Sequence, residues 1–174
     1  MLKDIDIIDV PSNYTSFYKK YINEEDKDFT RIKINNKIIH QSKLINYLTE
    51  DSSKKNTEKD LNDLFKKIKK SKDYFISTKD IILIETLKSD GIELTKKYKD
   101  MYQTDDYNMP TDIQFLITNN ETGMVLLRLV EIIGEDNLED IGTETLYFIV
   151  SALNQLNMDN LRNKILLKIL PLKV

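Results

Sequence analysis

Apolar residues of this chain recur at the spacing of an α-helix, and this periodicity constrains the fold more than any other feature. Between Thr57 and Ser71, the residues Leu61, Leu64, Phe65 and Ile68 fall at i, i+3, i+4 and i+7, on one side of a helix. Further helical segments are expected at residues 41–50, 77–91, 92–103, 110–117, 124–133, 143–156 and 157–170. Only 4 Gly and 3 Pro occur in 174 residues, which disfavours the many tight turns of an all-β fold.

Short polar links join these segments, so we expect antiparallel helix pairs that stack into a short α-solenoid-like array. The fold class is therefore mostly α. A hydrophobic content of 40% suffices for a core, and the length suits one domain. We expect a single domain over residues 1–174, with an N-terminal arm at residues 1–40 and the helical array at residues 41–174.

Two patterns occur in the arm. Residues 13–22 carry an aromatic stripe at helical spacing, which we interpret as docking a helix on the body rather than as a stacking platform for bases or sugars. Residues 31–41 alternate Ile32 and Ile34 with basic residues, break at residues 35–36 and become apolar again. This second pattern favours a small β-hairpin.

Two apolar segments predict where the core lies. Met124–Ile133 contains only Arg128 and Glu131 as polar residues, so we expect this helix at the centre of the core. The closing residues 166–174 are also apolar. We expect them to pack against Leu146–Leu156, to meet a partner, or to be buried in a homodimer.

The link after Ile133 is rich in carboxylates: Glu135, Asp136, Glu139 and Asp140. A calcium loop beginning at Asp136 would need an oxygen ligand at its third place, Gly at its sixth and Glu at its twelfth. Those places hold Leu138, Ile141 and Tyr147. We therefore interpret the link as a solvated connection between two helices.

The sequence nominates no catalytic, cofactor-binding or metal-ligating residue. The chain has no cysteine and a single histidine, His40, which cannot form an ordinary zinc site without further ligands. We interpret His40 as structural or exposed, because no local pattern supplies a nucleophile and an orienting carboxylate. No cofactor is expected. If the protein is an enzyme, a hydrolase with a carboxylate pair in a groove between helices is the alternative.

Residues Lys54–Lys72 form a basic stretch, with eight lysines against three acidic residues, a local excess of five positive charges. A weak binder of anionic surfaces is one interpretation, and the solvated face of an amphipathic helix is the simpler one. No arginine accompanies the lysines, and the whole chain has a net charge of −3. We therefore expect no nucleic-acid partner.

The beginning of the sequence carries Asp4, Asp6 and Asp9 where a signal peptide would be apolar, and no apolar run reaches 18 residues. We therefore expect no transmembrane segment. As given, the chain is expected to be soluble and cytoplasmic. The cell envelope is the alternative if the sequence is part of a longer exported chain.

Four stretches carry a resemblance: "IIHQSKLINYL", "ISTKDIILIETLKSDGIEL", "NETGMVLLRLVEIIGED" and "LNQLNMDNLRNKILLKILPLKV". Over roughly Arg31–Val174 the chain resembles the C-terminal helical region of conserved bacterial proteins of unknown function, chiefly alphaproteobacterial. The resemblance implies a helical-repeat solenoid and, in the longer forms, export. It transfers no functional residue.

These observations together predict a non-enzymatic protein-interaction or structural module. Helical arrays present extended surfaces, so the expected partner is another protein or the remainder of a longer chain. The hydrolase and the anionic-surface binder are the two alternatives.

Overall fold

The computed structural model describes residues 32–71, 73–104, 109–135 and 137–173 of the chain. Helices make up most of these residues, which confirms the mostly α fold. Contacts divide the chain into two compact units, residues 34–171 and residues 1–33 with 172–174. The helix predicted at residues 13–22 lies outside the described residues.

A two-stranded sheet in the smaller unit contradicts the predicted hairpin. β1 (Ile32–Lys33) pairs antiparallel with β2 (Leu172–Lys173), so its partner comes from the other end of the chain. The expected second strand is instead η3, a 3₁₀ helix at Ile39–Gln41. The side chain of Asn35 accepts a hydrogen bond from the Lys37 N–H at 3.1 Å, and this local turn leads into a helical conformation rather than a strand.

Serine residues begin the next two helices. Ser42 precedes the 3₁₀ helix η4 (Lys43–Tyr47), and its hydroxyl accepts a hydrogen bond from the Leu44 N–H. α2 (Lys54–Ile68) begins after Ser53, three residues before the expected start at Thr57. The Thr57 side chain is buried in the first turn and donates to the Ser53 carbonyl at 3.0 Å.

α3 (Thr78–Ser89) has the ends that its sequence predicts. Ser77 caps its N-terminus and forms a reciprocal capping box with Asp80. Gly91 follows its C-terminus with a φ of 82°, a conformation that glycine adopts without steric cost. Its apolar residues are almost completely buried: Ile81, Ile82, Leu83, Ile84 and Leu87.

The expected central helix is instead peripheral. The 3₁₀ helix η5 (Lys96–Met101) precedes a hairpin of α4 (Thr111–Thr118) and α5 (Thr122–Ile133). α5 ends before Gly134, as predicted, but only two of its side chains are buried. The prediction that Met124–Ile133 forms the centre of the core is therefore wrong.

The C-terminal helices complete the larger unit. A short 3₁₀ helix, η6 (Leu138–Asp140), leads into α6 (Thr143–Gln155) and α7 (Asp159–Ile169). α7 packs on α6, and Leu170 after it is only 2% exposed. Of the closing residues 166–174, Leu166, Ile169 and Leu170 are buried, and Leu172–Lys173 form β2.

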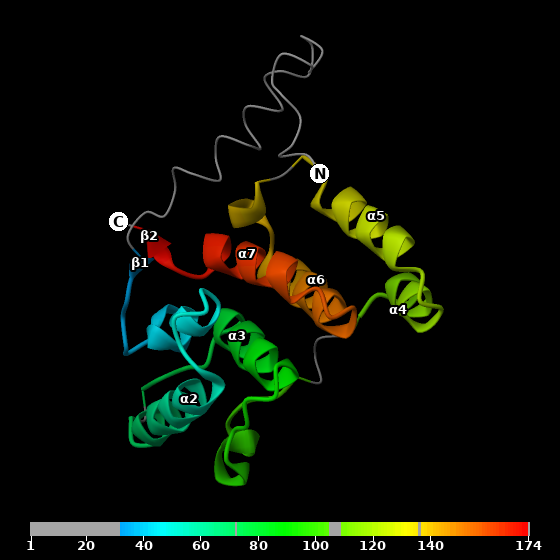
Figure 1. Cartoon of the computed structure of the whole chain (residues 1–174). Coiled ribbons are helices and arrows are strands. Elements are labelled where there is room, and N and C mark those ends of the chain that lie inside the picture. The colour runs from blue at the N-terminus through cyan, green and yellow to red at the C-terminus, as the bar shows by residue number, and fades with distance from the viewer. Residues whose placement is uncertain (1–31, 72, 105–108, 136, 174) are drawn as a thin grey trace. The chain divides into compact units, whose positions relative to one another are not determined.

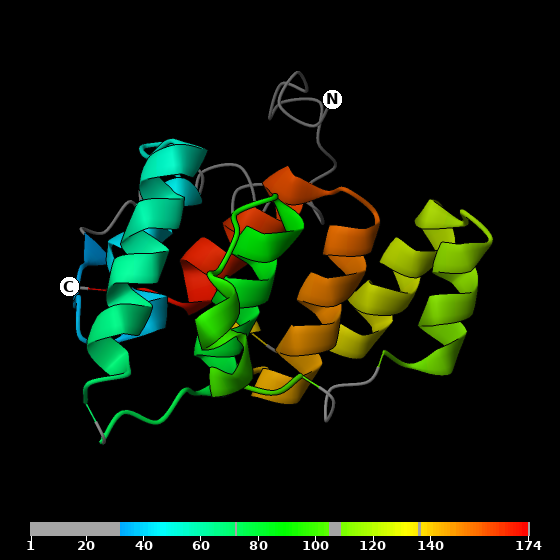
Figure 2. The same cartoon turned by 90° about the horizontal axis from the view of Figure 1, so that it is seen from below.

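Within the larger unit, α3 packs on α6 and on η3, and α2 packs on η4. Figures 1 and 2 show α2 at one end of this unit and the α4–α5 hairpin at the other, with α3, α6 and α7 between them. α5 packs mainly on α4. The core therefore lies around α3 and α6.

A buried arginine joins α7 to the end of α3. Arg162 is fully buried, and its guanidinium donates two hydrogen bonds to the Asp90 carboxylate, at 2.8 and 2.9 Å. It also binds the side-chain oxygens of Asn154 and Asn163 and the carboxylate of Asp159. The guanidinium is thus surrounded by acceptors, which a buried charge requires.

Replacing Asp90 should therefore destabilise the protein strongly. Asp90→Ala leaves the Arg162 charge without its bidentate partner, and we expect a loss of about 3 kcal/mol in the free energy of unfolding. Asp159→Ala removes an exposed partner of the same guanidinium and should cost about 1 kcal/mol or less. Urea denaturation measures both, and equal losses would contradict the account.

Candidate functional site

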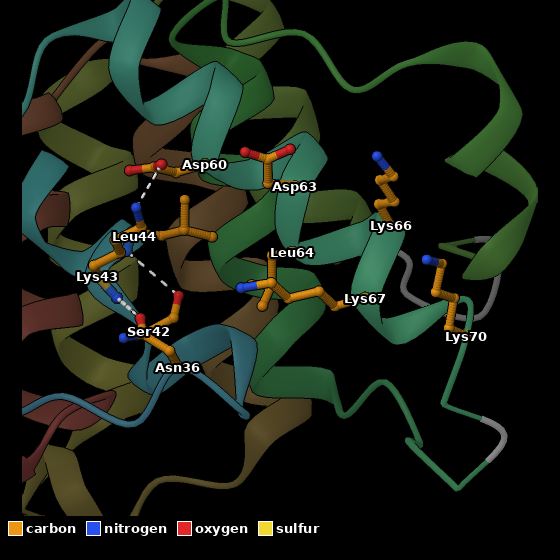
Figure 3. A pocket seen from close by; sticks show the side chains of 10 residues that line it. All are labelled: Asn36, Ser42, Lys43, Leu44, Asp60, Asp63, Leu64, Lys66, Lys67 and Lys70. Carbon is orange, nitrogen blue, oxygen red and sulfur yellow. Dashed lines mark hydrogen bonds and ion pairs between the residues drawn. The ribbon is translucent and has the colours of Figure 1, made fainter.

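A polar hollow of about 520 Å³ lies between α2 and η4 (Figure 3). Three lysines from the last turn of α2 and the residues just after it line the hollow: Lys66, Lys67 and Lys70. Lys43 also lines it but binds Asp60 at 2.6 Å. Asp63 is the other acidic residue of the lining, so the lysines outnumber the acidic residues by two.

The lysines of the predicted basic stretch lie in several different environments. The Lys54 ammonium donates to the Asp90 carbonyl, and Lys69 lies over the ring of Tyr98 at 6.0 Å. Neither lines the hollow. Among the described residues, Lys66, Lys67 and Lys70 form no ion pair. These three, which we call the pocket lysines, are the part of the stretch that faces one space.

The histidine that sequence analysis left without a partner binds a buried carboxylate. One oxygen of Asp80 accepts hydrogen bonds from the backbone N–H of His40 at 2.9 Å and from its Nδ1 at 2.6 Å. The other accepts from the Tyr74 hydroxyl and from the N–H and hydroxyl of Ser77, each at 2.9 Å. Asp80 is 1% exposed. The sequence signal was the Ser77-x-x-Asp80 spacing of a capping box, which does not reveal His40.

This cluster lacks the geometry of a catalytic triad. A triad needs a hydroxyl on the imidazole nitrogen that faces away from the carboxylate. With Nδ1–H donating to Asp80, the Nε2 atom of His40 accepts from the Gln41 side chain at 3.3 Å. The Ser77 hydroxyl donates to Asp80 instead. The cluster holds η3 on the beginning of α3, which is a structural role.

A second polar hollow, of about 620 Å³, surrounds the Arg162 cluster. Glu50, Asp90 and Asp159 are its acidic lining residues. Arg162 binds both aspartates, so these carboxylates balance a buried cation. Burial, followed by the nearby Asp90 carboxylate, raises the pKa of Tyr47 at its edge. Tyr47 is therefore a neutral hydroxyl at ordinary pH.

The acid-rich link does not form a site in the described part of the chain. Glu135, Glu139 and Asp140 are exposed, and Asp136 lies outside the described residues. No group of three or more His, Asp or Glu side chains in the described ranges could hold a metal ion.

The outer side of α5 is apolar and exposed. Met124, Leu127 and Val130 follow one another at intervals of three residues and are 53%, 61% and 64% exposed. Val125 and Leu129, on the opposite side of the helix, are buried. We call the exposed row Met124, Leu127 and Val130 the α5 face. The apolar character of this helix is evident in the sequence, but the position expected for it at the centre of the core is wrong.

Comparison of the chain with protein-family models, with curated proteins and with solved structures finds no match. The resemblance to the helical region of bacterial proteins therefore stays a prediction. Within the residues that the structure describes, no helix is both long and apolar enough to span a membrane.

The Asp80 cluster predicts a specific dependence of stability on pH. Burial acts to raise the pKa of Asp80, but hydrogen bonds from His40 and Ser77 outweigh it and hold the pKa below the ordinary 3.8. A lowered pKa gives stability that is complete above the unfolded value and is lost as the pH falls through the folded value. Wild-type stability should therefore fall between about pH 4 and pH 2.

Asp80→Asn tests this dependence, because the amide cannot carry the charge that the cluster binds. We expect a loss of about 2 kcal/mol in the free energy of unfolding at pH 7 and a shallower fall below pH 4. Asp63→Asn, at an exposed position of α2, should retain the wild-type pH profile. Urea denaturation at several pH values measures this, and parallel profiles for wild type and Asp80→Asn would contradict the account.

Proposed function

We propose that the protein is a non-enzymatic interaction module that presents the α5 face to a protein partner. The observation that carries the proposal is the exposure of Met124, Leu127 and Val130 at the end of the helical unit. Three large apolar side chains in a row on one helix are typical of a helix that another helix covers.

The two ends of the larger unit differ in a way that supports this proposal. At one end, the exposed residues of α2 are all charged or amide residues: Lys54, Lys55, Asn56, Glu58, Lys59, Asp63, Lys66 and Lys67. The α4–α5 hairpin lies at the other end (Figure 2). There α5 exposes apolar residues. Stacked helical arrays need a polar cover at each terminal helix. The α2 end has this cover, whereas the α5 end requires one.

Burial of the α5 face would contribute a modest binding free energy. Full burial of one such side chain contributes about 1.5–3 kcal/mol, and roughly half of each remains exposed here. The face would therefore contribute about 1 kcal/mol per side chain, which must offset the entropy lost on association. A specific partner would add polar contacts around it.

No observation favours the hydrolase alternative. A general acid needs a carboxyl group with a raised pKa. A hydrogen bond from Arg128 lowers the pKa of Asp112, and the pKa of Asp80 is lowered in its cluster. In the hollows, Asp60 binds Lys43, and Asp90 binds Arg162.

The pocket lysines favour a second candidate, a weak binder of anionic groups. Lys66, Lys67 and Lys70 line one hollow (Figure 3) and have no ion-pair partner among the described residues. The lysines would attract an anion in the hollow electrostatically, and added salt would weaken this attraction by screening. The same lysines also stabilise the negative C-terminal end of α2, which is their structural role.

Partner capture tests the first proposal. The double variant Leu127→Asp, Val130→Asp should reduce recovery of co-purifying proteins from native cells at least tenfold, because it places charge on the α5 face. Both positions are exposed, so stability should stay within about 0.5 kcal/mol of wild type. Phe75→Asp, at a residue 86% exposed elsewhere, is the matched control and should retain the partners. Equal recovery by all three proteins would refute the proposal.

Heparin and anionic lipid vesicles test the second candidate. The triple variant Lys66→Glu, Lys67→Glu, Lys70→Glu should abolish binding, because it reverses the charge around the hollow. The control triple Lys55→Glu, Lys59→Glu, Lys69→Glu changes the net charge equally, at positions in α2 or directly after it that do not line the hollow. If both triples bind as wild type does, or lose binding equally, the hollow is not an anion site.

A further inference from the structure

The packing of this chain does not account for Gly123. It lies in the first turn of α5, and a Cβ added there would meet no atom within 4 Å. Glycine is less favourable than alanine in a helix, and one of its uses is to let another backbone or side chain approach closely. The position therefore points to contact with a surface outside the single chain.

The exposed side of α5 is centred on Leu127. Successive helical residues are separated by about 100° around the axis, so the buried Val125 and Leu129 lie about 160° from Leu127, one on either side. Leu127 is itself 61% exposed. A second helix that covers α5 would therefore pass over Leu127, on the exposed side of α5.

From this arrangement we infer that the α5 face binds a second copy of this chain, antiparallel, about a twofold axis at Leu127. The inference rests on the proposed function, because it names the partner of the same face. In a twofold interface the same patch must be complementary to itself. The two flanks of Leu127 meet this condition.

On each flank of Leu127, a large side chain of one copy would pack beside a residue of the other copy that leaves room for it. Gly123 and Val130 lie on one flank of Leu127, and Met124 and Glu131 lie on the other. In the antiparallel pair, Val130 of each copy lies beside Gly123 of the other copy, where the absent side chain leaves room. Met124 lies along the methylene groups of Glu131 of the other copy, a contact that its flexible side chain suits.

The charges beside the face are compatible with this pairing. Arg128 donates to Glu131 and to Asp112 of its own chain, each at 2.9 Å, so the two charged residues of α5 are already paired within one copy. The two copies of Glu131 are eight helical residues apart along the antiparallel axes, about 12 Å. This separation exceeds the screening length at physiological salt, so their repulsion is small.

The expected interface is small and its affinity modest. α5 has 12 residues and is therefore about 18 Å long. One pair of such helices buries less than the roughly 800 Å² per partner of a standard stable interface. We therefore expect a reversible dimer with a Kd in the micromolar range.

Sedimentation velocity of the full chain over about 1 to 500 µM tests the dimer, since this range brackets a micromolar Kd. The wild type should change from monomer to dimer as concentration rises. Leu127→Asp and Gly123→Leu should each weaken the association at least tenfold, although a single chain has room for both side chains. Phe75→Asp should dimerise as the wild type does. A wild-type chain that stays monomeric, or variants that all dimerise equally, would overturn the inference.

A single cysteine tests the symmetry axis, because the chain contains none of its own. Leu127→Cys places two thiols opposite each other on the twofold axis, and oxidation should give a disulfide-linked dimer at least tenfold faster than Phe75→Cys. Equal rates for the two variants would show that Leu127 is not at the centre of an interface.

The outcomes separate this inference from the function on which it rests. If the wild type stays monomeric while partner capture still depends on Leu127 and Val130, the α5 face binds a different protein, and only the second copy is excluded. If neither dimerisation nor capture depends on the face, both proposals fail.

Discussion

Burial of α3 on nearly all sides is the constraint on which the rest of the larger unit depends. Its apolar residues meet η3 on one side and α6 on another. A carboxylate anchors each end: Asp80 binds His40 at the beginning, and Asp90 binds Arg162 at the end. These contacts join residues 40 and 72 positions apart in the chain. Segments from both ends of the larger unit are thereby tied to one helix.

The chemistry-bearing residues of the described chain are mostly used for this cohesion. His40, Asp80 and Tyr74 form one closed set of hydrogen bonds, and Arg162 is saturated by side-chain oxygens. A residue whose hydrogen-bonding groups are all occupied inside the fold has none left for a substrate. The proposed binding therefore uses two surfaces that the fold leaves uncovered, the α5 face and the pocket lysines.

The contrast between the two outermost helices links the fold to the proposed function. α2 buries one side and exposes only polar residues on the other, so it closes the array by itself. α5 buries Val125 and Leu129 but keeps a comparable apolar row in contact with water. Removing apolar surface from water lowers the free energy. The outer side of α5 therefore favours a covering partner, whereas the polar outer side of α2 favours contact with water.

Local periodicity, serine caps and glycines such as Gly91 and Gly134 are enough to predict the helical fold and many helix ends. The basic stretch Lys54–Lys72 is also evident in the sequence, but which of its lysines line one hollow is known only from the structure. Long-range packing, by contrast, sets which of two similarly apolar helices, α3 or α5, is central. It likewise decides that β1 pairs with the C-terminus and that Arg162, rather than Leu161, is buried. These features depend on contacts between residues distant in the sequence, such as Asp90 and Arg162, and periodicity along the chain carries no information about such contacts.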